Sequence, residues 1–373
     1  MQISFVGDIM LGRYVAEKYA KVPYELLSES VIKELQKADV RIANLESPIT
    51  SVEADDSLKF GGNKEILRQF SWINCFSLSN NHINDFGNQG MLDTIDNLDK
   101  EGIKYNGLYK ENYESFKIEK EAERIAVIMC TDMMNVEFDE SCPFKTLRVN
   151  EPDKVANEIH KCKEVGYFTI LFAHIGMLFS RFPNPPSRDF LHKMVDEGAD
   201  CIVTVHSHCI GCHEEYKGVH IFHSLGDFLM DGASFRRRTA YILSLEVKNN
   251  RIVNWIMQPT KTSMELQVVI PEDKEAKRIV SKYEKDSRKL AKIKDGYRSF
   301  YKREYRKDML SHSLSTLHFE LERRGIKGLA HILRVRFRDV FGMIKRMITD
   351  RSNMAYDTDG VDAKHKMSNK DIQ

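Results

Sequence analysis

The sequence predicts an α/β fold in which short buried strands alternate with helices. Apolar runs of strand length, such as residues 3–6 and 201–205, are separated by segments whose apolar residues recur every three or four positions. In residues 187–198, this spacing places Phe190 and Met194 on one face of a helix. Because a helix with one apolar face must cover another apolar surface, we expect helices packed in layers on a sheet.

The expected elements can be placed in chain order. Helices are predicted at residues 31–38, 91–101, 152–165 and 187–198, where apolar residues have helical spacing and two of the segments stop at Gly102 and Gly198. Strands are predicted at residues 3–6, 40–44, 125–130, 168–173, 201–205, 219–224 and 241–247. The last strands follow one another without a helix between them, so the sheets are expected to be mixed.

Length and charge divide the chain further. At 373 residues and 42% apolar composition, it can form one large core and carry an appended region. The formal net charge is +1, yet residues 274–351 contain 23 Lys/Arg against 10 Asp/Glu, and residues 1–273 carry a net charge of −11. We therefore expect a principal domain at 1–270, a basic helical extension at 271–350 and a disordered tail at 351–373.

Cysteine usage and hydropathy indicate a cytoplasmic protein. The seven cysteines are odd in number and scattered along the chain, which favours free thiols in a reducing compartment. The first residues form a strand-like run rather than a signal peptide, and no stretch approaches 18 uninterrupted apolar residues.

Polar side chains that can bind metal ions follow five of the apolar runs. They are Asp8, then Asn44 and Glu46, then Asn81 and His82, then His174, and finally His206 and His208. Strand ends would carry these carboxylate, amide and imidazole groups to a common surface. A pair of divalent cations about 3.5–4 Å apart requires such a set with a bridging carboxylate. The pattern therefore predicts a metal-dependent hydrolase.

Each of these residues also has a purely structural interpretation. His206 and His208 could be loop histidines that bind only water or backbone, although residues i and i+2 of a strand share a face. Asn81 and His82 also suit a turn, and Asp8 could cap the next helix. Five strand ends with complementary ligand types are difficult to explain as caps, so the metal site is the favoured hypothesis.

The ordered motifs resemble those of the CapA family, which is associated with poly-γ-glutamate capsule synthesis. They are GDIML at 7–11, NLESPIT at 44–50, NNHINDFG at 80–87, AHIG at 173–176, HSH at 206–208 and SLGDF at 224–228. The resemblance covers roughly residues 1–235. It implies a calcineurin-like metallophosphoesterase fold, which is a four-layer α/β/β/α sandwich with mixed sheets, here followed by the basic C-terminal helical extension.

The resemblance also implies a dinuclear site of divalent metal ions. Carried over by position, Asp8 and His208 would bind the first ion, Asn81, His174 and His206 would bind the second, and Glu46 would bridge them. Nitrogen and oxygen ligands admit Mn, Fe, Zn or Mg.

The implied reaction is attack of a metal-bound hydroxide on a phosphoester or related anionic substrate. His82 would be the general acid, Asp85 would orient His82, and Arg13 and Asn44 would hold an anionic group of the substrate.

Several positions depart from the metallophosphoesterase or the CapA-family pattern, including Thr204 and Val205, where a Gly and a His commonly precede the HxH motif. Met10 stands where a His usually follows the first Asp by two residues, which weakens the first metal position. Leu178 stands where a Glu is expected after the His174 motif, and Asp227 replaces the Asn of the SLGNF signature. These changes indicate altered substrate contacts.

Two basic segments have several interpretations. Residues 325–348 form an amphipathic basic helix, which could contact the inner face of the membrane, hold an anionic polymer, or pack on the main domain with the preceding helices. Nucleic acid is not favoured. The run at residues 236–238 is expected to be a solvated surface, with contact to an anionic substrate as the alternative.

Two functions fit these features. The first is a hydrolase or transferase that acts on a phosphorylated substrate or an anionic polymer in capsule or surface-polymer biosynthesis. The second is a non-catalytic assembly component that associates with capsule-synthesis proteins and has a structural or vestigial metal site. Because the ligand residues persist while their surroundings differ from the family pattern, the enzyme is favoured.

Overall fold

The computed structural model describes residues 1–52, 61–232 and 234–324. The predicted amphipathic helix at 325–348 and the predicted tail at 351–373 lie outside these residues. Met1–Thr316 form one compact unit, and Leu317–Gln373 belong to a second.

The first unit contains two mixed sheets. The eight-stranded sheet has the order β14-β13-β12-β1-β2-β3-β4, with β11 also paired to β1. Its strands are β1 (Gln2–Ile9), β2 (Val40–Leu45), β3 (Cys75–Ser77), β4 (Lys104–Asn106), β11 (Asp227–Leu229), β12 (Thr239–Val247), β13 (Ile252–Thr262) and β14 (Val268–Val269). β1 to β4 pair in parallel, whereas β12 to β14 are antiparallel.

The six-stranded sheet has the order β5-β6-β7-β8-β10-β9. Its strands are β5 (Phe116–Lys120), β6 (Glu123–Thr131), β7 (Phe168–His174), β8 (Cys201–Val205), β9 (His213–Tyr216) and β10 (Val219–Phe222). Its four central strands are parallel, and β5 and β9 join its edges as antiparallel partners.

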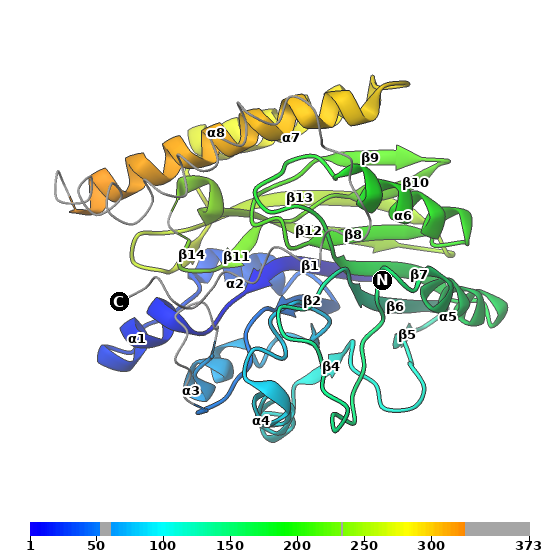
Figure 1. Ribbon diagram of the computed structural model, residues 1–373, viewed down its shortest axis with the longest axis horizontal. Helices are drawn as coiled ribbons and strands as arrows, with labels where there is room; N and C mark the ends of the chain where they lie inside the picture. Colours follow the sequence, from blue (N-terminus) through cyan, green and yellow to red (C-terminus); the bar gives the residue numbers. More distant parts are fainter. Residues whose placement is uncertain (53–60, 233, 325–373) are drawn as a thin grey trace. The chain divides into compact units, whose positions relative to one another are not determined.

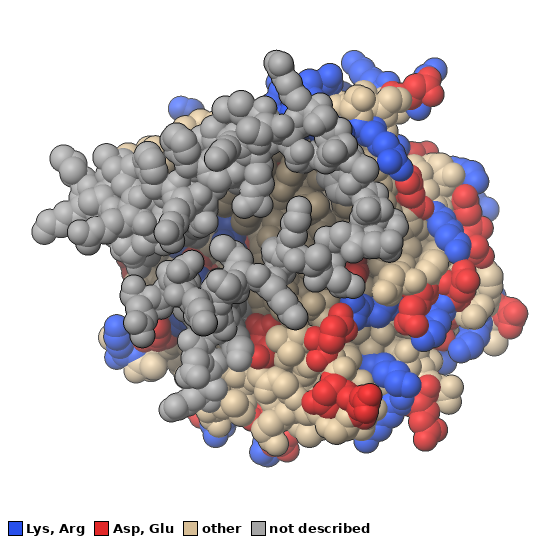
Figure 2. Space-filling view, in the orientation of Figure 1, with Lys and Arg blue, Asp and Glu red and all other residues tan. Residues whose placement is uncertain are grey.

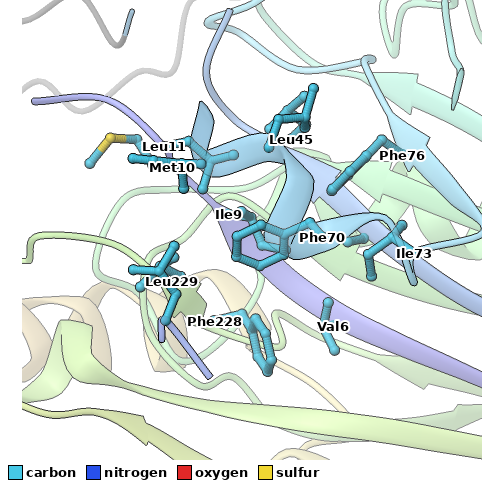
Figure 3. Close-up of a cluster of buried hydrophobic side chains, with 14 of the residues drawn as sticks. Val6, Ile9, Met10, Leu11, Leu45, Phe70, Ile73, Phe76, Phe228 and Leu229 are labelled. Atoms are coloured by element: carbon cyan, nitrogen blue, oxygen red, sulfur yellow. The ribbon is translucent and has the colours of Figure 1, made fainter. Parts of the chain in front are cut away.

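Three apolar clusters define the layers. The inner cluster lies between the sheets, where the rings of Phe5 in β1 and Phe172 in β7 are 5.4 Å apart. A second cluster covers the other face of the larger sheet (Figure 3), and a third covers the outer face of the smaller sheet. The predicted four-layer α/β/β/α sandwich is confirmed, and Figure 1 shows both sheets with their flanking helices.

The outer helices bury one face each, as their spacing predicts. The larger sheet is covered by α1 (Arg13–Lys21), α2 (Glu29–Leu35), α3 (Lys64–Leu67), the 3₁₀ turn Arg68–Phe70 and α4 (Gly87–Lys100). The smaller sheet is covered by α5 (Pro152–Glu164) and α6 (Pro185–Asp196), which both have a proline in the first turn.

The described part of the basic extension is a helical hairpin. α7 (Asp273–Ala291) and α8 (Tyr297–Arg324) follow the last strand, and α7 contacts β9 and β13. Arg181, in the loop after β7, joins them by ion pairs to Asp286 of α7 and Asp308 of α8. Within the described ranges, no helix is long and apolar enough to cross a membrane. Figure 2 shows basic and acidic side chains interspersed over the described part of the face in view.

Candidate metal centre

The sheet topology brings the predicted polar residues together. Asp8 lies near the end of β1, Glu46 follows β2, and His174 ends β7, so each is at the carboxyl end of a parallel strand. The segments after β3 and β8 add Asn81 with His82 and His206 with His208. All of these side chains are buried. Polar residues far apart in the sequence therefore surround one point between the two sheets.

The pairing register of β1 changes on both sides of Asp8. The register of β1 against β2 changes between Phe5 and Asp8, and its register against β11 changes between Asp8 and Ile9. As a result Phe5 packs in the inner cluster and Ile9 in the outer one. Such irregularities commonly redirect a side chain beside a functional site. β1 and β11 also approach closely, because a Cβ on Gly7 would lie 1.8 Å from the Gly226 carbonyl oxygen.

Two groups of potential ligand atoms share one carboxylate. Glu46, His174 and His206 form one group, and Asp8, Glu46 and His208 form the other, with the ligand atoms of each group within 4.8 Å of one another. Glu46 Oε1 is 3.6 Å from His174 Nε2 and 3.8 Å from His208 Nε2. Glu46 is therefore positioned between the two groups.

Asn81 adds an amide oxygen to the first group. Its Oδ1 lies 2.8 Å from His174 Nε2, and His206 Nδ1 lies 2.8 Å from the same nitrogen. In the second group, His208 Nδ1 is 3.9 Å from Asp8 Oδ2. The structure thus brings together all six residues that the resemblance implies as metal ligands, with Asn81 beside the first group.

The electrostatics of the site fit a bound cation. Both carboxylate oxygens of Glu46 are buried and have no hydrogen-bond partner among the residues that the structure describes. Burial, followed by the charges of Asp8 and Asp227, raises the pKa of Glu46 well above its usual range. Burial and the charge of Asp227 likewise raise the pKa of Asp8 to about 8. Three buried carboxylates repel one another, and a divalent cation would remove this penalty.

The histidines are in the form that binds metals. Burial and the neighbouring imidazoles of His206 and His208 lower the pKa of His174 well below its usual range. Burial and His208 lower the pKa of His206 to about 3. Neutral imidazole nitrogens beside carboxylate oxygens are a donor set for Mn, Fe, Zn or Mg. The residues present therefore fit divalent metal ions.

The loop that carries two of the histidines has unusual backbone angles. His206 has φ of 102° and His208 has φ of 56°, both in the region that favours glycine. The His206 backbone N–H donates a hydrogen bond to Asp8 Oδ2 at 3.1 Å. Such local strain is typical of functional sites, where the surrounding structure must hold it in place.

His82 and Asp85 form a pair beside the two groups. His82 Nδ1 is 2.7 Å from Asp85 Oδ2, and His82 Nε2 is 4.0 Å from Glu46 Oε1. Asn135 lies 3.1 Å from His82 Nδ1 and accepts a hydrogen bond from Asn81 at 3.1 Å. His82 Nε2 therefore faces the two ligand groups, and His82 Nδ1 lies against the Asp85 carboxylate.

The two residues predicted to hold substrate differ in position. Asn44 is fully buried, donates a hydrogen bond to Asp8 Oδ1 at 2.7 Å and accepts one from Asn80 at 3.2 Å. Arg13 is outside the buried cluster, with a side chain 37% exposed and its Nε 3.3 Å from Asp231. Asn44 contacts a potential metal ligand directly, whereas Arg13 is at the surface.

The sequence prediction of the site omitted Asp227 and Arg237. Asp227 Oδ1 lies 2.8 Å from His208 Nδ1, and Arg237 Nε lies 3.5 Å from Asp227 Oδ2. The guanidinium of Arg237 also lies 5.7 Å from the ring centre of Phe179. In the sequence, Asp227 could have been found because it replaces the Asn of the SLGNF signature.

The prediction that residues 236–238 form a solvated surface is wrong, because Arg238 is buried and the side chains of Arg236 and Arg237 are largely covered.

Met10, which replaces a potential histidine ligand, lies in the apolar cluster outside the larger sheet. It is fully buried there, and Figure 3 shows it beside Leu11. Its sulfur accepts a hydrogen bond from the Gly12 backbone at 3.2 Å. Position 10 is thus part of the hydrophobic core. A further carboxylate, that of Asp227, lies beside His208 and Asp8 instead.

This chain is similar in sequence or in fold to several known proteins. The chain is 28% identical to the PGA biosynthesis protein CapA of Bacillus subtilis, over 80% of this chain and 82% of the relative. It is 26% identical to the capsule biosynthesis protein CapA of Bacillus anthracis, over 67% of this chain and 64% of the relative. Among solved structures, the NAD nucleotidase of Haemophilus influenzae aligns with a TM-score of 0.44 and 13% identity, over 84% of this chain and 60% of that one. The family model for bacterial capsule synthesis protein PGA_cap matches residues 2–232, and the chain belongs to this family.

Proposed function

We propose that this protein is a metal-dependent hydrolase, or a transferase, that acts on a phosphoester or related anionic group in capsule or surface-polymer biosynthesis. The observation that carries the proposal is Glu46, whose two buried oxygens lie between two groups of potential ligands and have no hydrogen-bond partner within the described part of the chain. The names of the two CapA relatives support a setting in capsule or poly-glutamate synthesis.

The proposed ligands divide between two cations. Asp8, Glu46 and His208 would hold one, and Glu46, Asn81, His174 and His206 would hold the other. When bound, divalent ions would polarise the scissile group, lower the pKa of water and stabilise developing negative charge.

The remaining residues position groups and move a proton. In our proposal His82 donates a proton from Nε2 to the leaving group, since Asp85 holds its Nδ1. Asn44 fixes the orientation of Asp8 through its hydrogen bond to Oδ1, and this is a positioning role. Arg13 would contact an anionic part of the substrate away from the reacting atoms. We further propose that residues 325–348 contact the inner face of the membrane. The protein would also associate with capsule-synthesis proteins.

Metal content and turnover test the proposal together. Elemental analysis of the purified protein should find bound divalent metal in the wild type and little in Glu46→Gln. With Mn²⁺, Zn²⁺ or Mg²⁺, the wild type should hydrolyse a generic phosphodiester or phosphomonoester. His82→Ala should retain its metal and lose about 10²–10⁴-fold in rate.

The alternative function predicts a different result. A non-catalytic assembly component would show no turnover with any of these metals, and Glu46→Gln would still support capsule formation in cells. Wild-type protein that binds no metal under any of these conditions would overturn the proposed centre itself.

A further inference from the structure

A cavity lies between α7 and the loop that follows His208. It has a volume of about 320 Å³, which is within the range of small-ligand pockets. One wall is formed by Cys209, Ile210 and Gly211, the next by the 3₁₀ turn Phe235–Arg238, and the third by α7. None of the potential metal ligands lines it. The cavity is therefore a separate site, although Cys209 directly follows His208.

Four cationic side chains line this cavity. They are Arg181, Arg236, Arg278 and Lys282, and the carboxylate among the lining residues is Asp286. Asp286 is already engaged, because it accepts hydrogen bonds from Arg181 Nη1 at 2.6–2.7 Å. Positive charge therefore exceeds negative charge in the lining.

Lys282 is the lining cation that lacks a partner. Within the part of the chain that the structure describes, it has neither an ion pair nor a hydrogen bond, whereas Lys289 on the same helix pairs with Glu304. The Lys282 side chain is exposed to solvent on one side, but desolvation by the protein atoms around its ammonium group, followed by the charges of Arg236 and Arg181, lowers its pKa. Leaving a cation beside two others is unfavourable unless an anion joins them.

Two of the arginines that line the cavity, Arg181 and Arg236, are fixed in place by ion pairs. Arg181 and Arg236 share Asp308 of α8, with Arg181 Nε 2.5 Å and Arg236 Nη2 3.3 Å from Asp308 Oδ1. Arg236 also donates to the backbone carbonyl of Asp308 at 2.6 Å. Guanidinium groups held in this way lose little conformational entropy when an oxyanion binds beside them.

We propose that this cavity binds an oxyanion, a phosphate or carboxylate group, through Lys282 with Arg236 and Arg278. Lys282 and Arg278 are exposed on α7 and can close on the anion, while Arg236 provides fixed positive charge at the wall. Because the cavity adjoins the His208 loop, the anion can be a remote group of the substrate of the proposed metal centre or a separate small ligand. The first of these sources rests on the proposed function.

Anion titration of the full-length protein tests the site. The probes are inorganic phosphate and a short glutamate oligomer, each measured by isothermal titration calorimetry. Loss of one charge-assisted hydrogen bond should weaken binding about 10–100-fold in Lys282→Ala, and Lys282→Glu should abolish it. Lys285→Glu is the matched control, because Lys285 is exposed on the same helix and does not line the cavity. Its affinity should equal that of the wild type.

A second comparison separates this site from the metal centre. Glu46→Gln should bind the anion as the wild type does, even where it has lost its metal. Loss of binding in Glu46→Gln would place the anion at the metal centre and overturn the cavity proposal. Unchanged affinity in both Lys282 variants, or no binding of either probe to the wild type, would overturn it as well, whatever the activity of the enzyme. Preference for phosphate over the oligomer would identify a phosphorylated ligand, and the reverse would identify a polycarboxylate.

Discussion

Two buried acidic clusters in this protein differ in how their charge is balanced. At the metal centre, Asp8 and Glu46 are fully buried, and burial with mutual repulsion raises the pKa of both. In the helical hairpin, Asp286 of α7 and Asp308 of α8 are also buried, but Arg181 pairs with each of them.

Glu304 of α8 extends the second cluster and shows the same balance. Although burial opposes the change, hydrogen bonds from Lys289 and Lys307 lower the pKa of Glu304 to about 2. In the described residues, Arg and Lys side chains pair with the carboxylates of the second cluster, whereas the Glu46 oxygens in the cluster that we propose binds metal have no hydrogen-bond partner. In the structural site the positive charge comes from Arg and Lys side chains of the chain itself, whereas in the proposed binding site it would come from bound metal ions.

The largest expected effect follows from removing the internal cation. Arg181→Leu leaves Asp286 buried without its ion-pair partner and Asp308 with Arg236 alone, and should reduce the free energy of unfolding by about 3–5 kcal/mol. Urea denaturation followed by circular dichroism measures this. The control is Arg68→Leu, which breaks exposed pairs with Glu65 and Glu101 and should reduce the free energy of unfolding far less, because solvent screens exposed ion pairs. Equal losses in the two variants would show that the hairpin cluster is not a structural centre.

Removing a charge from the metal centre should have the opposite effect on the metal-free fold. The pKa of Glu46 is raised in the folded state, so its ionised form opposes folding at neutral pH. After chelation, Glu46→Gln should therefore unfold at the same temperature as the wild type or higher. Added Mn²⁺ or Zn²⁺ should raise the unfolding temperature of the wild type by several degrees and leave the variant unchanged. A chelated variant that is clearly less stable than chelated wild type would contradict this sign.

A smaller effect is expected where a carboxylate orients a potential ligand. Asp227→Asn preserves the shape of the side chain beside His208 Nδ1 and removes one negative charge. Outer partners of this kind typically contribute 10–100-fold to metal affinity. Competition with a fluorescent chelator should show this loss for one metal equivalent and little change for the other, because the His174 and His206 group lies on the far side of Glu46. An equal loss for both equivalents would mean that Asp227 acts on the whole centre.

The residues of the two clusters were not equally predictable from the sequence. Asp8, Glu46 and His174 could be found because each interrupts or follows an apolar strand, which is a local signal. The layered α/β class could be predicted for the same reason, since the strands and most helices have clear periodicity, whereas the four-layer sandwich was implied by the resemblance to the CapA family. α1 was missed because most of its residues are polar or partly exposed, and Val15 is its buried residue.

Long-range pairing explains what the sequence did not reveal. Arg181 and Asp308 are 127 residues apart, and no local pattern links them. Asp227 lies within the apolar run of β11, where its pairing with His208 depends on how β11 meets β1. The arginines at 236–238 resemble a solvated run for the same reason, because their partners come from distant segments. Charge partners of this kind require the tertiary structure.

The smallest effect on metal binding is expected at Met10, which lies in the apolar cluster outside the larger sheet. Met10→Leu conserves volume within the apolar cluster and should cost less than about 1.5 kcal/mol, with unchanged metal content. Met10→His places an imidazole among apolar side chains and should cost about 1–3 kcal/mol without adding a ligand. Thermal unfolding and elemental analysis of the two variants, side by side, measure both quantities. If Met10→His instead tightened metal binding, position 10 would belong to the metal centre rather than to the hydrophobic core.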